Sequence, residues 1–177
     1  MTAIEYIRME LKRLHTMLDA TLEDITDEQL HAAPGGQKKV NTIAWTVFHV
    51  VRTEDNIVRF VLQDRRSPVW VEGTYAQKFG LPPVAQGTGM TSEDAQALRI
   101  KDMALWKEYQ QKVWASTEEC FERAPAGFWD KTVTIKGMGE MPAWRAVAHI
   151  CLSHGLMHAG QTETARTLVG AKPVINV

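Results

Sequence analysis

Long apolar segments are missing from this sequence, and cysteine is scarce. No apolar run approaches the roughly 20 residues that a membrane-spanning helix needs, so we expect no membrane partner. The first ten residues carry charges throughout and lack the apolar core of a signal peptide. Cys120 and Cys151 are the only cysteines, too few for a disulfide framework or a cysteine metal site. These absences predict a cytoplasmic protein.

An excess of charge of either sign is also absent. The 20 Lys and Arg residues nearly balance the 21 Asp and Glu residues, which leaves a formal net charge of −1. Because proteins that bind nucleic acid electrostatically carry an excess of basic charge, we expect no nucleic-acid partner. The apolar fraction of 45% and the length of 177 residues are those of one globular domain with a real core. No repeat or linker divides it, so we predict a single domain over residues 1–177.

Apolar residues recur every three or four positions in four segments, the pattern of amphipathic helices. The predicted helices run over residues 4–18, from the cap Asn41 to near Gln63, from Ser92 to just before Pro125, and from near Pro142 to about Val169. Four such helices in one domain predict an all-α fold, a four-helix bundle.

A long connection, over residues 65–91, joins the second and third predicted helices. It is interrupted by glycine and proline and has no clear periodicity. Its aromatic residues Trp70, Tyr75 and Phe79 predict that it packs against the bundle. Before the fourth helix, residues 131–136 alternate between polar and apolar side chains, which predicts a short strand.

His154 and His158 are four residues apart in the fourth predicted helix. Four residues make about 400° of turn, so both imidazoles lie on one face, where a single metal ion can reach them. Measured from Cys151, at the centre of the apolar stripe, His158 lies at about 20° and His154 at about 60°. Both therefore point inward. His149, at about 160°, is expected to face solvent or a partner, and Cys151 is expected to be a small buried hydrophobe.

A buried imidazole needs a partner, because an unpaired polar group in an apolar core costs about 1–3 kcal/mol. The partner is either a shared metal ion or the backbone and side chains of the core, and the residues alone leave both open. Two familiar metal-binding helix motifs are excluded. A zincin needs glutamate directly after its first histidine, where this sequence has Gly155. A di-iron bundle needs two Glu-x-x-His units, and only Glu28 to His31 matches.

A catalytic metal site has a third protein ligand and keeps one position open. The second predicted helix offers two candidates: Glu54 lies near the centre of its aliphatic stripe, and His49 shares the other side with Trp45. The residues alone do not decide between them. Because apolar or aromatic residues lie on both sides of this helix, we expect it to be buried on two faces. That is more than one bundle core requires, which favours a homodimer.

Two motifs carry a resemblance to a known family. They are the segment Asn41–Val50 and, far downstream, His154-x-x-x-His158-x-Gly160-Gln161 followed by Arg166 and Gly170. In order and spacing the chain resembles the DinB-like superfamily over nearly its whole length. That superfamily includes proteins related to the bacillithiol- and mycothiol-dependent transferases. The resemblance implies a four-helix bundle, often a homodimer, with a divalent metal held by His49, His154 and His158. The run from Arg52 to Asp55 departs from some members.

The resemblance and the histidine pair together predict an enzyme. One divalent transition metal ion (Zn, Ni or Fe) is expected to activate a low-molecular-weight thiol, a cosubstrate, for S-transfer to a small-molecule substrate. Glu54, Asp55 or Gln161 is expected to orient or deprotonate the nucleophile. Gln161 lies on the same face as the two histidines, and a purely structural hydrogen bond is its alternative role. Glu54 has an alternative too, an ion pair with an arginine across the bundle.

Two other functions stay open. The first is a metal-dependent hydrolase, in which bound water replaces the thiol. The second is a non-enzymatic interaction module, a dimer whose helices are stapled by a metal with a closed coordination shell. For an enzyme, we expect the walls of the pocket to come from residues 65–91 and from aromatic residues such as Trp45 and Phe48.

Overall fold

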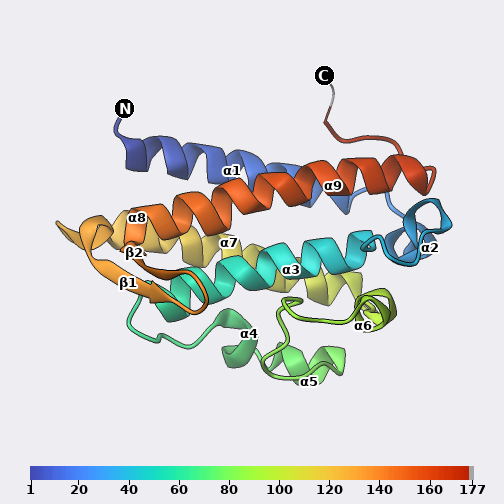
Figure 1. The fold of residues 1–177 in the computed structure, drawn as a ribbon, viewed down its shortest axis with the longest axis horizontal. Helices are drawn as coiled ribbons and strands as arrows, with labels where there is room; N and C mark the ends of the chain where they lie inside the picture. The colour runs from blue at the N-terminus through green and yellow to red at the C-terminus, as the bar shows by residue number, and fades with distance from the viewer. Residues whose placement is uncertain (176–177) are drawn as a thin grey trace.

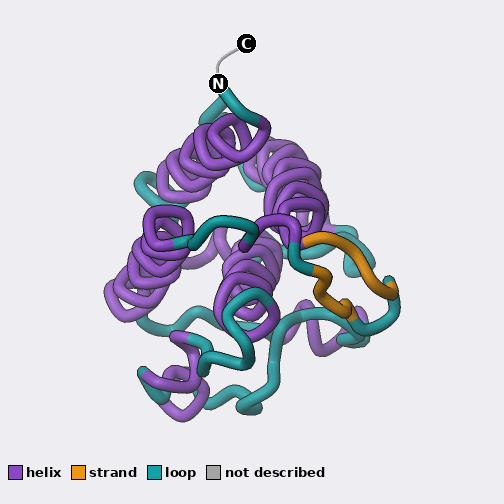
Figure 2. Tube along the Cα trace, turned by 90° about the vertical axis from the view of Figure 1, so that its left-hand side faces the viewer, coloured by secondary structure: helices purple, strands orange, loops and turns teal. Residues whose placement is uncertain are grey.

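Four long helices pack around one apolar core in the computed structural model, which describes residues 1–175 (Figure 1). They are α1 (Ala3–Thr21), α3 (Ile43–Asp55), α7 (Met103–Arg123) and α9 (His154–Leu168). Figure 2 views this arrangement along the helices. The predicted all-α fold, a four-helix bundle with a long connection between the second and third helices, is confirmed.

Shorter elements extend and connect the four helices. Two segments with wider, π-type turns continue them: η2 (Asn56–Val61) follows α3, and η4 (Val147–Ser153) lies between α8 (Ala143–Ala146) and α9. The remaining elements are α2 (Asp27–His31), η1 (Pro34–Gly36), α4 (Val69–Glu72), α5 (Tyr75–Phe79), α6 (Ser92–Ala97), η3 (Phe128–Asp130), β1 (Thr132–Ile135) and β2 (Gly139–Pro142). Among the described residues, the structure contains no helix with the length and apolar character to cross a membrane.

α1 shows how the sequence fixes a helix end and a buried face. The Thr2 hydroxyl accepts the Glu5 N–H, and the Glu5 carboxylate accepts the Thr2 N–H, which satisfies two backbone donors of the first turn. Leu11, Leu14 and Leu18 are completely buried. Each such side chain contributes about 1.5–3 kcal/mol to folding, so the apolar stripe holds α1 against the bundle.

α3 is the central helix, and all of its residues are buried. Its N-cap is Thr42, not the predicted Asn41: the Thr42 hydroxyl accepts the Trp45 N–H at 3.1 Å. α3 contacts α9, η4, α7 and α4. His49, on one side, meets His154 of α9, and Glu54, on another, meets Thr117 of α7. The predicted burial of this helix on two faces is therefore confirmed. Both faces are covered by other parts of the same chain.

The third predicted helix is two helices. Ser92 begins only the short α6, which is capped by Thr91, and the long α7 starts eleven residues later with Asp102 as its cap. The chain between them is extended, and its Ile100 N–H donates to His31 Nε2 on α2 at 3.0 Å. The Ile100 N–H thus bonds to another part of the chain instead of to a carbonyl within a helix. The apolar spacing of the sequence does not reveal this break, because it continues through the segment.

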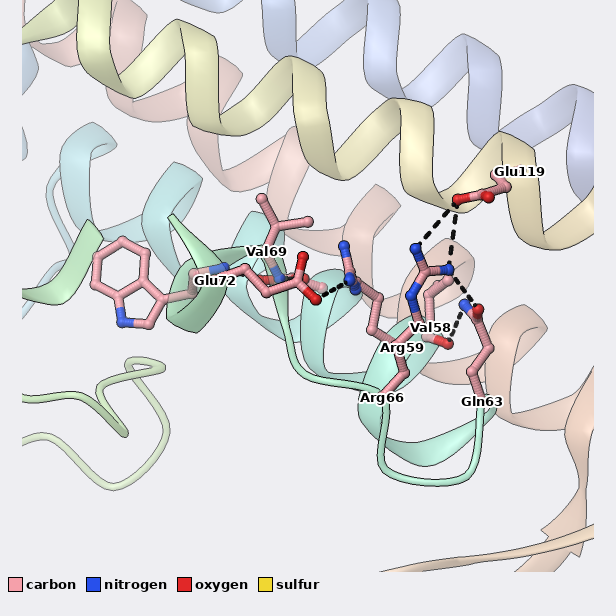
Figure 3. Close-up of polar contacts among 9 residues, drawn as sticks. Val58, Arg59, Gln63, Arg66, Val69, Glu72 and Glu119 are labelled. Carbon is pink, nitrogen blue, oxygen red and sulfur yellow. Dashed lines mark hydrogen bonds and ion pairs between the residues drawn. The ribbon is translucent and has the colours of Figure 1, made fainter. Parts of the chain in front are cut away.

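The connection over residues 65–91 packs against the bundle, as its aromatic residues predict. Trp70, Tyr75 and Phe79 are buried, and the ring of Trp70 lies parallel to that of Phe79 with centroids 5.9 Å apart. Polar contacts fasten the start of the connection (Figure 3). Arg59 of η2 pairs with Glu72 of α4 at 2.5 Å, and Arg66 reaches Glu119 of α7 at 3.4 Å.

The fourth helix spans the predicted residues, but its first turns are rotated relative to a regular α-helix. The wider turn in η4 adds about one residue, hence roughly 100°, to the path of the chain. Trp144, which an unbroken helical period places on the apolar stripe, is therefore 40% exposed, while Ala143 and Ala146 are buried. The predicted strand is present as β1 and pairs antiparallel with β2, with Val133 opposite Met141.

Candidate metal centre

Three histidines from two helices converge at one point of the bundle. His49 comes from α3, and His154 and His158 come from consecutive turns of α9. The His154 Nε2 atom lies 3.2 Å from Nε2 of His49 and 3.0 Å from Nε2 of His158. The three possible ligand atoms all lie within 4.8 Å of one another, and this is the only such group of three among the described residues.

The other ring nitrogen of each histidine faces an oxygen acceptor. Nδ1 of His49 lies 2.7 Å from the Gln86 carbonyl, and Nδ1 of His154 lies 3.2 Å from the Ile150 carbonyl. Nδ1 of His158 lies 2.8 Å from Oε1 of Gln161. We therefore assign the proton of each neutral ring to Nδ1, which leaves a lone pair on each Nε2. This arrangement is the one that orients histidine ligands in metal sites.

Three lone pairs that face one another repel unless a cation lies between them. Imidazole nitrogens about 2.0–2.1 Å from one tetrahedral metal ion lie roughly 3.3 Å from each other, close to the two observed separations. The donor set thus fits a divalent transition metal ion. The alternative of two core histidines bonded only to backbone and side chains accounts for the Nδ1 atoms but not for the convergence of Nε2.

Burial keeps the three imidazoles neutral. It is the largest cause that lowers the pKa of His49, His154 and His158 below the ordinary value of 6.5. Positive charge on a neighbouring histidine lowers each pKa further: the charge of His158 acts on His154, and that of His49 acts on His158. A neutral imidazole is the form that binds a metal ion.

The chain over residues 85–87 holds His49 in place. Arg52 Nε donates to the Ala85 carbonyl at 2.9 Å, and the next carbonyl, of Gln86, accepts from His49. Gly87 follows with φ of +87°, and a Cβ atom added there would lie 3.0 Å from both Cβ and Nδ1 of His49. Only glycine accepts both this conformation and this contact. On its other side, the His49 ring stacks on Trp45 with centroids 4.9 Å apart.

Asp55 fastens the same connection at its other end. Its carboxylate accepts the Val69 and Trp70 N–H groups at the start of α4 and also pairs with Arg52. Burial raises the pKa of Asp55, and these donors act against that shift. Asp55, named from the sequence as a group that could act on the nucleophile, thus has both oxygens engaged in holding residues 65–91 to α3.

Glu54 lies on the other side of α3 from His49. Five residues turn a helix by about 500°, which leaves the two side chains about 140° apart. The Glu54 carboxylate accepts from His15 Nε2 of α1 at 2.9 and 3.0 Å and from the Thr117 hydroxyl of α7 at 2.6 Å. It is 1% exposed. Between the two open candidates for the third ligand, the structure places His49 with the α9 pair and joins Glu54 to His15.

Two residues of the histidine cluster line a pocket of about 900 Å³. His49 and Trp45 line it from α3, and His154 lines it from α9. The other walls come from residues 86–92, from η2 and η4, and from the turn of the β-hairpin over residues 134–138. Trp45 and the long connection form parts of the pocket wall, as the sequence predicts. Phe48 is instead a core residue, 1% exposed and packed against Trp70 and Trp106.

Comparison with known proteins shows which family this chain matches and which solved structure has a similar fold. The family model of the DinB superfamily matches residues 10–162. The chain belongs to the DinB superfamily. A solved structure of similar fold is described as the conserved protein of locus from Enterococcus faecalis, with a TM-score of 0.80 and 18% identity. The alignment covers 96% of this chain and 99% of that one. Among curated proteins, none matches this sequence.

Neither cysteine of this DinB protein joins the histidine cluster, and burial disfavours the reactive thiolate form of both. Both are free and buried, and burial raises the pKa of Cys120 to about 11 and that of Cys151 well above its ordinary value. His149 is exposed, as its angle on the helix predicts, and it lines the metal pocket. On the sequence alone, His15 lies next to Leu14 and off the centre of the apolar stripe, yet it follows Leu11 by four residues and precedes Leu18 by three. That spacing places it on the buried face of α1.

Proposed function

We propose that this DinB protein is an enzyme that uses a divalent metal ion, held by His49, His154 and His158, to activate a low-molecular-weight thiol for S-transfer. The observation that carries this proposal is the convergence of three Nε2 atoms whose Nδ1 atoms all face acceptors. When bound at such a site, a zinc, nickel or iron ion lowers the pKa of a coordinated thiol and so produces a thiolate at neutral pH.

An enzyme fits the surroundings of the histidines better than a structural metal site does. A structural site is enclosed by four protein ligands, whereas a catalytic site has three and stays open to a ligand from solvent. Here two of the three histidines, His49 and His154, line a pocket of about 900 Å³. That volume is within the range of pockets that bind small molecules. These features support an enzyme over a metal-stapled interaction module.

Thiol transfer fits the pocket better than hydrolysis of the metalloprotease kind. Such a hydrolase uses a carboxylate beside the metal as general base for water. None of the residues that line the pocket within the described chain is Asp or Glu. A thiol needs no such base once its pKa is lowered by coordination, because it then loses its proton to solvent. The hydrolase therefore remains the second candidate.

The residues around the three ligands take separate roles in this proposal. Gln161 is a positioning residue, because its side-chain oxygen accepts from Nδ1 of His158 and fixes the direction of that ring. Trp45 holds the ring of His49 by stacking and forms part of the pocket wall. We assign Glu54 a structural role through His15 and Thr117, in place of the catalytic role expected from the sequence.

The proposal has a direct test in thiol conjugation. Metal-loaded protein should accelerate the conjugation of small thiols to an electrophilic aromatic probe, and His49→Ala should abolish the gain. A panel of cysteine, glutathione, bacillithiol and mycothiol would identify the cosubstrate. Lys101→Met, at an exposed position outside the pocket, is the matched control. Metal-dependent ester or amide hydrolysis without thiol conjugation would establish the hydrolase instead. Failure of both reactions, together with metal that accepts no added ligand, would leave the structural module.

The homodimer and the cytoplasmic location stay proposals. The apolar residues on both sides of α3 are covered by the chain itself, so they no longer favour a dimer. The homodimer now rests on the family resemblance, and sedimentation showing only a 19.9 kDa species would count against it. Two free cysteines agree with a reducing compartment.

A further inference from the structure

The metal pocket has an uneven distribution of charge. The chain contains 21 Asp and Glu residues, yet none of them lines the pocket within the described residues. The lining does include Lys136, from the turn of the β-hairpin, and His149, from η4. A bound divalent ion with three neutral ligands would add further positive charge. A negatively charged molecule is therefore attracted to this pocket and meets no carboxylate inside it.

Lys136 is free to bind such a molecule. The described lysines that form ion pairs with carboxylates are Lys12, Lys107, Lys112 and Lys131, each outside the metal pocket. Lys136 is exposed and has no ion pair among the described residues. An ammonium group donates hydrogen bonds and accepts none. Lys136 can therefore donate to a negatively charged ligand in the pocket.

Two further donors line the same pocket. His149 is exposed, and an imidazole N–H can donate to an anion. Trp45 is 8% exposed, and its Nε1 atom is buried with no acceptor in the described part of the chain. A buried donor without an acceptor costs about 1–3 kcal/mol.

Large apolar side chains line the outer part of the pocket. Phe60 of η2 is 42% exposed, Met138 of the hairpin turn is 48% exposed and Met157 of α9 is 62% exposed. Ile57, Ile135 and Ile150 contribute to the same lining from three different elements. A ligand that covers these side chains removes their apolar surface from water, at about 25 cal/mol for each Å². The pocket thus has an apolar part as well as positive charge.

We propose that the pocket binds an amphipathic anion, a molecule with an apolar body and a carboxylate-like group, and that Lys136 and His149 bind its negative group. The apolar body lies against Phe60, Met138 and Met157. This proposal rests on the proposed function in that it assigns a substrate class to the same pocket. The negative group belongs either to the thiol or to the electrophile.

The first test measures binding by metal-loaded protein with calorimetry. The two probes are 6-mercaptohexanoate and 6-mercaptohexanol, which share a thiol and an apolar chain but differ in charge. Wild-type protein should bind the acid at least tenfold more tightly than the alcohol. Lys136→Met should bring this ratio to within about twofold, and His149→Phe should lower it partly. Lys101→Met should leave the ratio at its wild-type value.

Several results of this test would overturn the proposal. Equal affinity of wild-type protein for the two thiols would show that the pocket has no preference for an anion. If the preference for the acid persists unchanged in Lys136→Met, the charge of the metal causes the preference and this lysine does not. If Lys101→Met also loses the preference, the net charge of the protein causes it and the pocket residues do not.

The second test separates this proposal from the proposed thiol chemistry. Metal-free protein is titrated with 4-phenylbutyrate and with its amide, neither of which contains a thiol. A preference for the carboxylate that disappears in Lys136→Met supports the anion site even if neither thiol binds the metal-loaded protein. In that case only the thiol function fails. Equal affinity for the carboxylate and the amide overturns the anion site even if both thiols bind.

Discussion

α3 carries a buried polar cluster on each of two sides, and the clusters differ in how their atoms are satisfied. On one side, His15 donates to Glu54, which also accepts from Thr117, so each of these contacts joins a donor to an acceptor. On the other side, His49 and His154 present acceptor atoms to each other at 3.2 Å. The first cluster is complete within the chain. The second leaves facing acceptor atoms that a bound cation would satisfy, and this difference distinguishes a structural histidine from a candidate ligand.

The largest expected effect is on folding stability, at the complete cluster. His15→Ala leaves the buried Glu54 carboxylate with Thr117 as its only partner and removes a ring stacked on Trp114. The loss of hydrogen bonds to a buried carboxylate and the loss of a buried, packed ring together cost roughly 3–5 kcal/mol of unfolding free energy. Urea denaturation of metal-free protein measures it. His158→Ala, the matched variant in the other cluster, should cost less than about 1 kcal/mol there, because it relieves lone-pair repulsion.

The opposite ranking of these two variants would remove the distinction between the clusters. Where His15→Ala protein stays folded, it should hold as much metal as the wild type, since His15 contacts none of the three proposed ligands. Loss of metal from a folded His15→Ala variant would join the clusters into one functional unit.

Metal affinity should show the second largest effect, at the incomplete cluster. His158→Ala removes one of three proposed ligands, and we expect affinity to fall roughly 100-fold or more, which is about 2.7 kcal/mol or more. Competition with a chromogenic chelator measures the change, and circular dichroism should show an unchanged helical signal. Wild-type affinity in this variant would mean that His158 is not a ligand.

A smaller effect should follow from the residue that orients His158. Gln161→Ala removes the acceptor of its Nδ1 proton, and loss of such a partner typically lowers metal affinity about 10-fold. Thr164→Ala, at an exposed position farther along α9, is the control. Because Gln161 is itself exposed, its variant should fold normally. An effect no larger than that of the control would leave Gln161 without a role at the site.

The smallest effect concerns the pH dependence of stability. Folding lowers the pKa of His49, His154 and His158 in the absence of metal, chiefly through burial. As the pH falls below about 6.5, the unfolded chain therefore takes up protons before the folded chain does, and stability decreases. The stability contribution of these groups is complete above that pH and is lost as the pH falls through the lowered pKa values. Urea titrations at pH 7.5 and 5.5 should show this loss, and His154→Ala should reduce it.

The same comparison shows how far the sequence predicts this molecule. Helical periodicity predicts the four long helices and the inward direction of His154 and His158, because those features depend on spacing along one helix. It cannot decide between His49 and Glu54, since both are buried on α3 and only their neighbours on α1, α7 and α9 differ. The family resemblance selected His49, and the structure places it beside the other two histidines.

Features that depend on tertiary contacts could not be predicted in the same way. The wide turn of η4 shifts the register by about one residue, and an unbroken helical period therefore places Trp144 on the wrong face. The end of α6 depends on a hydrogen bond from Ile100 to His31. The contribution of Lys136 to the pocket depends on how the β-hairpin lies against the helices.

The central claim is that three histidines hold one divalent metal ion, and X-ray absorption of protein purified without an affinity tag tests it most directly. The account predicts about one transition metal ion per chain, with about three imidazole nitrogens at about 2.0–2.1 Å. His158→Ala should lower the number of imidazoles, the metal content or both. Protein without bound metal that takes up none on addition, or a coordination shell of carboxylate oxygens that is unchanged in His158→Ala, would contradict the claim.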